Sequence, residues 1–291
     1  IRDSSVTGVQ TCALPIYAFT TPAHRRLIFE EFFLFQAGLV LRKRKQAEFR
    51  KPRPVRVDDR IRDAAREVLP FKLTNGQRTA LKEIVDDMRR DEPMNRLLQG
   101  DVGAGKTIVA LLAAIVAMEN GFQVAFMAPT EILADQHYLT IRRLLERTRF
   151  RVVSLTGSLS AAKRREVHAE IASGVAHLVV GTHALAEGDL AFHALGLVII
   201  DEQHRFGVMQ RASLRSKGQC PDVLVMTATP IPRTLALTTY GDLDVSVIRE
   251  LPPGRQPIAT ASKSESKREE VYRLVRRELE AGRQEIGRAH V

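Results

Sequence analysis

The string GDVGAGKT, residues 100–107, constrains the fold of this 291-residue chain more than any other part of its sequence. It fits the pattern G-x-x-x-x-G-K-[ST], in which backbone amides surround phosphates, the lysine reaches the β- and γ-phosphates and the hydroxyl binds Mg²⁺. The pattern works where a strand ends and a helix begins, because a helix N-terminus attracts anions. We therefore predict a nucleoside triphosphate site, with Lys106 at the phosphates and Thr107 at the metal. The glycines expected to shape the loop around the nucleotide are Gly100, Gly103 and Gly105.

The sequence on both sides of this loop has the pattern of a parallel α/β fold. Short apolar runs alternate with amphipathic segments, as in βαβ units whose helices cover a parallel sheet. The predicted strands are residues 96–99, 123–128, 152–155, 177–180, 197–201, 223–227 and 244–248. The predicted helices are residues 77–90, 106–120, 132–146, 160–173 and 267–281. The expected fold is therefore an α/β, parallel-sheet P-loop NTPase domain.

Two adjacent acidic residues, Asp201 and Glu202, follow the apolar run at residues 197–200. In open α/β sheets, ligands bind beyond the carboxyl ends of the strands. Phosphoryl transfer commonly uses one carboxylate to hold the metal and another group to orient the attacking water. We assign Asp201 to the metal together with Thr107, and Glu202 to the water. Lys106, Asp201 and Glu202 are therefore the predicted catalytic residues, although such an acidic pair alone can be only a polar strand end.

The charge balance favours a polyanionic partner. Lysine and arginine number 44 against 34 aspartates and glutamates, a formal net charge of +10. Nucleic acid is the commonest such partner, while a generally basic surface is the alternative that composition leaves open. The cysteines, Cys12 and Cys220, have neither metal-ligand nor disulfide-framework spacing, which favours a reducing, cytoplasmic setting. No apolar run approaches the ~20 residues of a membrane-spanning helix.

The segments outside the sheet pattern give the expected domain boundaries. Residues 23–49 predict a long, well-buried helix ending in a basic run, and residues 50–56 predict a basic linker because two prolines interrupt regular structure. Residues 10–16 and 285–291 can be encoded by nearly reverse-complementary DNA strings that resemble a sequencing-library adapter. We interpret residues 1–16 as a non-native leader, the alternative being a natural one, and residues 285–291 as a non-native tail. Between them, residues 17–56 carry the helix and linker, and residues 57–284 carry the predicted nucleoside triphosphate-binding domain.

Ordered blocks of sequence resemble superfamily 2 helicases, and among them ATP-dependent DNA helicases that remodel branched DNA. The matching blocks are residues 69–77, 100–107, 128–137, 155–158, 181–185, 201–208, 226–234 and 241–255. The resemblance implies a first, RecA-like helicase motor domain that uses ATP and Mg²⁺ and binds DNA without sequence preference, in the bacterial cytoplasm at the nucleoid. It also implies a second motor domain and an N-terminal wedge domain outside this sequence. We expect the chain alone to bind Mg·ATP weakly, hydrolyse it slowly and unwind nothing.

The resemblance also implies roles for further residues around the nucleotide. Gln77 matches the glutamine that reads adenine, and Phe71 could stack on the base, with a buried core position as the alternative. Gln203 and His204 extend the nucleotide site from the acidic pair. Coupling between hydrolysis and motion is expected at Thr227, Ala228 and Thr229.

DNA contacts are expected from the blocks opposite the nucleotide. The resemblance assigns this role to Pro129, Thr130, Thr156, Gly157, Thr182 and His183. Their small polar groups and backbone amides would contact phosphate oxygens. None of Arg205, Arg211 and Arg233 is assigned as arginine finger, because the resemblance places the finger in the second motor domain.

Two other functions remain open at this level. One is the motor of a transcription-repair coupling DNA translocase, which shares the phosphate loop and the block at residues 226–234. The other is a non-catalytic scaffold that binds ATP or DNA. A scaffold is expected to have lost Lys106 or Glu202, and both residues are present.

Overall fold

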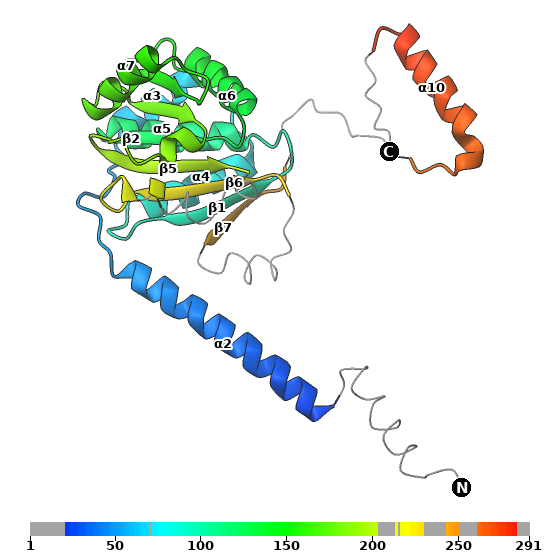
Figure 1. The fold of residues 1–291 in the computed structure, drawn as a ribbon, viewed down its shortest axis with the longest axis horizontal. Helices are drawn as coiled ribbons and strands as arrows, with labels where there is room; N and C mark the ends of the chain where they lie inside the picture. Colours follow the sequence, from blue (N-terminus) through cyan, green and yellow to red (C-terminus); the bar gives the residue numbers. More distant parts are fainter. Residues whose placement is uncertain are drawn as a thin grey trace. The chain divides into compact units, whose positions relative to one another are not determined.

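The computed structural model describes residues 21–69, 71–202, 213–214, 216–229, 243–250 and 261–283. The chain divides into two compact units, Ile1–Pro252 and Pro253–Val291. The first unit contains the predicted α/β domain (Figure 1). The predicted non-native ends, with Gln203, His204, Arg205, Arg211 and Arg233, lie outside the described residues.

The described strands form one seven-stranded sheet in the order β3-β4-β2-β5-β6-β1-β7, and every pairing is parallel. Figure 1 shows β2, β5, β6, β1 and β7 side by side in this order. Every predicted strand is confirmed, with ends that shift by a few residues. Central strands such as β2 and β6 are buried along their whole length, which explains their continuous apolar runs. The strands are β1 Asn95–Gly100, β2 Gln123–Met127, β3 Val152–Leu155, β4 Leu178–Gly181, β5 Leu195–Asp201, β6 Asp222–Thr227 and β7 Asp244–Ile248.

Helices pack on both faces of this sheet. One apolar core joins one face of the strands to α3 Asp59–Val68, α4 Asn75–Met88, α5 Lys106–Glu119 and α6 Glu131–Leu144. The other core joins the opposite face to α7 Ala161–Ala172 and to the short 3₁₀ helix η1 His183–Ala186. Helix α5 is buried from Val109 to Met118, so it forms the centre of its layer. Among these helices, the sequence pattern did not predict α3 or the short η1.

The long helix α2 spans Pro22–Ala47, close to its predicted range. Its apolar side chains are exposed, with Phe29 at 60% and Leu34 at 69%, so the expected burial is not found within the described residues. In the second unit, η3 Glu265–Lys267 and α10 Arg268–Glu280 contain no buried residue. Among the described helices, none combines the length and apolar composition that a membrane crossing requires.

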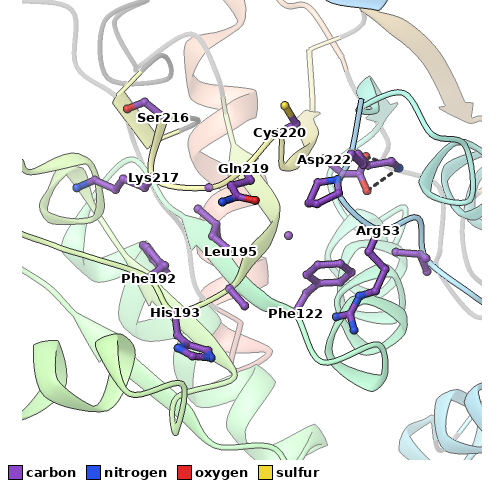
Figure 2. Close-up of a pocket in the computed structure, with 16 residues that line it drawn as sticks. Arg53, Phe122, Phe192, His193, Leu195, Ser216, Lys217, Gln219, Cys220 and Asp222 are labelled. Atoms are coloured by element: carbon purple, nitrogen blue, oxygen red, sulfur yellow. Dashed lines mark hydrogen bonds and ion pairs between the residues drawn. The ribbon is translucent and has the colours of Figure 1, made fainter. Parts of the chain in front are cut away.

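The predicted basic linker, residues 50–56, has no regular secondary structure but is fastened to the sheet. Its Lys51 forms an ion pair with Asp222, the first residue of β6, and both side chains are buried. Val55 joins the core, and the Arg53 guanidinium lies 4.5 Å from the centre of the Phe122 ring. These residues line a pocket of about 430 Å³ at the amino ends of the strands. Figure 2 shows Arg53, Phe122 and Asp222 around it. The pocket therefore lies at the opposite ends of the strands from the predicted nucleotide site, which is at their carboxyl ends.

Candidate nucleotide site and nucleic-acid edge

The phosphate loop has the predicted strand–loop–helix context. Strand β1 ends at Gly100 and α5 begins at Lys106. Gly103 and Gly105 have φ values of +80° and +88°, a left-handed backbone that glycine adopts without steric cost. The first amide groups of a helix lack partners within the helix, and their dipoles favour an anion. The loop is therefore built to surround phosphate groups at the start of α5.

Lys106 is the first residue of α5, and its side chain turns back onto this loop. Its Nζ donates hydrogen bonds to the carbonyl oxygens of Gly100, at 2.7 Å, and Asp101, at 3.1 Å. Burial lowers the pKa of Lys106, and this outweighs the opposite effect of nearby carboxylates, of which Glu202 acts most strongly. A cation held between the loop and the acidic pair suits the predicted role of Lys106 at the β- and γ-phosphates.

Gln77 lies beneath the loop and uses both ends of its amide. Thr74 and Gln77 form a capping box at the start of α4, in which the Thr74 N–H donates to Gln77 Oε1 at 3.0 Å. Gln77 Nε2 donates to the carbonyl oxygen of Ala104 at 2.8 Å. The Gln77 side chain thus supports the loop and is only 3% exposed. Its predicted contact with adenine stays a prediction.

Phe71 precedes the same helix and is 49% exposed. The alternative of a buried core position is therefore wrong. Its ring lines a largely apolar pocket of about 740 Å³, together with Leu69 and Leu73. An exposed aromatic ring close to Gln77 in sequence remains available to stack on a base.

Asp201 is the last residue of β5, which lies beside β6 in the sheet, and Glu202 follows it. Glu202 has a φ of +50°, unusual for a residue other than glycine, and such strain is often found at functional sites. Its Oε1 accepts a hydrogen bond from the backbone N–H of Ala228 at 3.1 Å. The Thr227 and Thr229 hydroxyl oxygens are 2.8 Å apart. The structure thus joins the predicted water-orienting carboxylate directly to the predicted coupling segment.

The other carboxylate, Asp201, contacts a histidine for which the sequence gave no role. His137 Nε2 lies 2.8 Å from Asp201 Oδ2, and each side chain is 14% exposed. His137 belongs to one of the matching blocks, at residues 128–137, but its proximity to Asp201 depends on strand order. The one sequence signal is helical spacing, since His137 lies three residues after Ala134 and four before Ile141, which both face the core. This spacing predicts that the histidine faces the sheet, but not that it contacts Asp201.

The residues predicted to contact DNA follow the carboxyl ends of β2, β3 and β4, which are neighbours in the sheet. Pro129 and Thr130 are half-buried, and Gly157 and His183 are exposed. Thr130 caps α6 by accepting a hydrogen bond from the Leu133 N–H. These positions form one edge, and their contact with DNA stays a prediction.

Two members of the predicted DNA set are turned inward. Thr156 and Thr182 are 4% and 2% exposed. The Thr156 hydroxyl lies 3.1 Å from the Ser158 hydroxyl, and the Thr182 hydroxyl is buried without a hydrogen-bond partner among the described residues. At these two positions the whole residue is buried, so the structure does not present their hydroxyls at the surface.

The donor groups at the acidic edge fit Mg²⁺. The described residues contain no group of three or more His, Cys, Asp or Glu side chains that could hold a metal by themselves. Mg²⁺ is usually held by one or two carboxylates together with substrate phosphates and water. A hydroxyl from Thr107 and a carboxylate from Asp201 are hard oxygen ligands of this kind.

Comparisons with known proteins identify the family of this chain. A model of the DEAD/DEAH box helicase family matches residues 74–238. The "ATP-dependent DNA helicase RecG" of Aquifex aeolicus is 52% identical over 283 residues, covering 97% of this chain and 35% of the relative. The protein of the same name from Synechocystis is 50% identical, covering 90% of this chain and 32% of the relative.

Solved structures give the same result. A structure described as RecG bound to a three-way DNA junction is 42% identical with a TM-score of 0.79, covering 89% of this chain and 35% of that one. The chain thus spans about a third of the length of these relatives. The resemblance to superfamily 2 helicases and the P-loop helicase fold are both confirmed. The family model covers more than half of the sequence, and the chain therefore belongs to the DEAD/DEAH box helicase family.

Proposed function

We propose that this chain is the first motor domain of an ATP-dependent DNA helicase that translocates on and remodels branched DNA in recombination and repair. The observation that carries the proposal is that the carboxyl ends of the strands carry two separate sets of predicted groups, one for the nucleotide and one for DNA. The predicted phosphate- and metal-binding groups follow β1 and β5, and the predicted coupling residues lie at the end of β6, while the predicted DNA groups follow β2, β3 and β4. The two sets meet where β2 pairs with β5, so one sheet supports ATP chemistry beside a nucleic-acid surface.

In the proposed reaction, each group has one task. Lys106 and the first amides of α5 bind the β- and γ-phosphates, while Gln77 and Phe71 bind adenine. Thr107 and Asp201 would hold Mg²⁺, which supplies positive charge where negative charge develops on the phosphates. Glu202 orients the attacking water and, through Ala228, connects the state of the nucleotide to residues 227–229. Gln203 and His204 complete the proposed nucleotide site.

The relatives support branched DNA as the substrate, because one was solved on a three-way DNA junction. Backbone contacts to DNA phosphates would be independent of sequence and strongly dependent on salt. An arginine finger contributes on the order of 10³ to 10⁵ in turnover. Since we assign the finger to a second motor domain, we expect weak Mg·ATP binding and slow hydrolysis from this chain alone. The compartment that fits is the bacterial cytoplasm at the nucleoid, where the DNA lies.

Binding of a fluorescent ATP analogue in the presence of Mg²⁺ tests the nucleotide site. Lys106→Ala is expected to weaken binding at least about 10-fold, because removing one charge-assisted contact costs about 1.5–3 kcal/mol. Lys82→Ala is the matched control, because Lys82 is exposed on α4 and the same charge is removed away from the loop. Equal affinity in wild type and Lys106→Ala would refute the phosphate assignment.

DNA binding and hydrolysis test the rest of the proposal. The chain is expected to bind a three-way junction with an affinity that falls steeply as salt rises. Mixing it with the second motor domain and the wedge domain of a full-length relative is expected to raise ATP turnover. Binding of nucleotide without turnover in that mixture would favour the scaffold alternative. A translocase that couples transcription to repair would instead require RNA polymerase for its activity.

A further inference from the structure

We propose that His137 is a positioning residue that fixes the metal-holding carboxylate Asp201 through a hydrogen bond. The inference rests on the proposed function, since it takes Asp201 as the metal-holding group. The contact is short, at 2.8 Å between His137 Nε2 and Asp201 Oδ2, and both side chains are largely buried.

The chemistry of the two groups sets the direction of the bond. An ionised carboxylate can only accept hydrogen bonds, so the Nε2 of His137 must carry the proton that is shared. One oxygen of Asp201, Oδ2, is therefore engaged by the protein. The other, Oδ1, is left to face the metal or a water of the metal. Carboxylate ligands are commonly held in this way by an outer partner that fixes their orientation.

The histidine ring is itself held in place. The ring centres of His137 and Phe126 are 4.7 Å apart with an interplanar angle of 47°. His137 lies on the inner face of α6, one turn from Ala134 and one turn from Ile141, which are fully buried. Phe126 is fully buried in β2. Because the His137 ring packs between its own helix and Phe126 of β2, its Nε2 keeps one orientation.

The order of the strands brings His137 to Asp201. Helix α6 follows β2, and β2 pairs with β5, the strand that ends at Asp201. His137 therefore reaches from the helix that follows β2 to the end of the neighbouring strand, β5. A hydrogen bond within β5 or its own loop would move with Asp201, whereas this one ties Asp201 to another element.

The test measures metal affinity separately from nucleotide affinity. Mn²⁺ binding to the chain with ADP is followed by electron paramagnetic resonance, and ADP binding is measured in parallel with the metal chelated. Two amide variants are compared, His137→Gln and His137→Asn. The glutamine amide nitrogen reaches about as far as imidazole Nε2, while that of asparagine reaches only as far as Nδ1, so the pair differs in reach but not in chemistry.

We expect His137→Asn to weaken Mn²⁺ binding roughly 10- to 100-fold, the usual effect of losing an outer partner. We expect His137→Gln to stay within about threefold of wild type, because the bond to Asp201 is restored. ADP affinity without metal should be unchanged in both. Should His137→Asn lose its cooperative melting transition, His137→Leu replaces it as the variant without a donor.

Equal Mn²⁺ affinities in the Asn and Gln variants would overturn the inference, because metal binding would then not depend on an amide that reaches Asp201. Asp201→Asn separates this failure from that of the proposed function. If Asp201→Asn weakens Mn²⁺ binding and His137→Asn does not, only the positioning role is refuted. If Asp201→Asn leaves Mn²⁺ binding unchanged, the metal assignment itself fails, and the inference with it.

Discussion

The buried ion pair between the linker and β6 gives a prediction in which stability depends on pH. Lys51 Nζ donates to Asp222 Oδ1 at 3.1 Å and to the Met88 carbonyl oxygen at 2.8 Å. Asp222 Oδ1 also accepts the Met94 N–H at 2.7 Å. Burial raises the pKa of Asp222 from its ordinary 3.8 to about 6, although Lys51 acts in the opposite direction. Desolvation thus outweighs the attraction to Lys51.

The size of the effect follows from that pKa. Each unit corresponds to 1.36 kcal/mol, so folding disfavours the ionised form of Asp222 by about 3 kcal/mol above pH 6. Between pH 3.8 and about 6 the folded chain binds more protons at this site than the unfolded chain does. The contribution of Asp222 to stability is therefore fully present below pH 3.8 and is lost as the pH rises through about 6.

Lys51→Met removes the partner and leaves the carboxylate buried. Breaking such a pair costs about 3–5 kcal/mol, which we expect at pH 7.5. At pH 5 the loss should be smaller by at least about 1 kcal/mol, because the pKa of Asp222 rises further without Lys51 and the neutral acid forms. In the double variant with Asp222→Asn, the amide oxygen can still accept from Met94. Replacing both charges is often neutral or stabilising, so we expect stability close to wild type.

Urea denaturation at pH 7.5 and pH 5 measures these free energies of unfolding. Lys51→Met, Asp222→Asn and the double variant complete a double-mutant cycle. Two outcomes would refute the reasoning. One is a Lys51→Met loss that is the same at both pH values, and the other is a double variant as unstable as Lys51→Met alone.

Glycine positions give two further predictions. Gly105→Ala should lower the melting temperature and weaken nucleotide binding, because alanine at φ +88° costs about 1–2 kcal/mol and its Cβ would overlap Gln77 Nε2; unchanged binding in a fluorescence titration would contradict this. Gly181→Ala should cost more than about 3 kcal/mol in urea denaturation, because its Cβ would overlap the carbonyl oxygen of Leu155 in β3. Gly188→Ala is its control, expected within about 0.5 kcal/mol of wild type since nothing lies within 4 Å of the added Cβ.

The strands could be predicted from the sequence because they are buried on both faces. Residues 123–127 and 222–227 are buried throughout, so each appears as an apolar run bounded by polar residues. Helix α3 was missed because most of its ten residues are polar and only Ile61 and Val68 are buried. Its one local signal is the N-cap Asp58, whose side chain accepts from the Ile61 N–H.

The site was predictable only where it is local in sequence. Lys106 belongs to a contiguous loop, and Asp201 and Glu202 end an apolar run, so each carries its own signal. The Glu202–Ala228 bond instead requires that β5 and β6 be neighbours, an order that no local pattern specifies. The resemblance gave Gln77 a role at adenine, but its bond to Ala104 beneath the phosphate loop depends on how α4 packs.

The position of α6 has a mechanical consequence for the proposed motor. Its N-cap is Thr130, in the predicted DNA edge, and two turns later His137 contacts Asp201 in the predicted metal site. A helix moves as a rigid unit over such a length, so a shift at its first turn is carried to His137. Hydrogen bonds weaken steeply once they bend, and they also weaken as they lengthen. A small displacement of His137 would therefore weaken its hydrogen bond to Asp201, which is 2.8 Å long between Nε2 and Oδ2. If DNA displaced α6, the His137–Asp201 hydrogen bond would change and with it the orientation of the Asp201 carboxylate. The phosphate loop would not have to move.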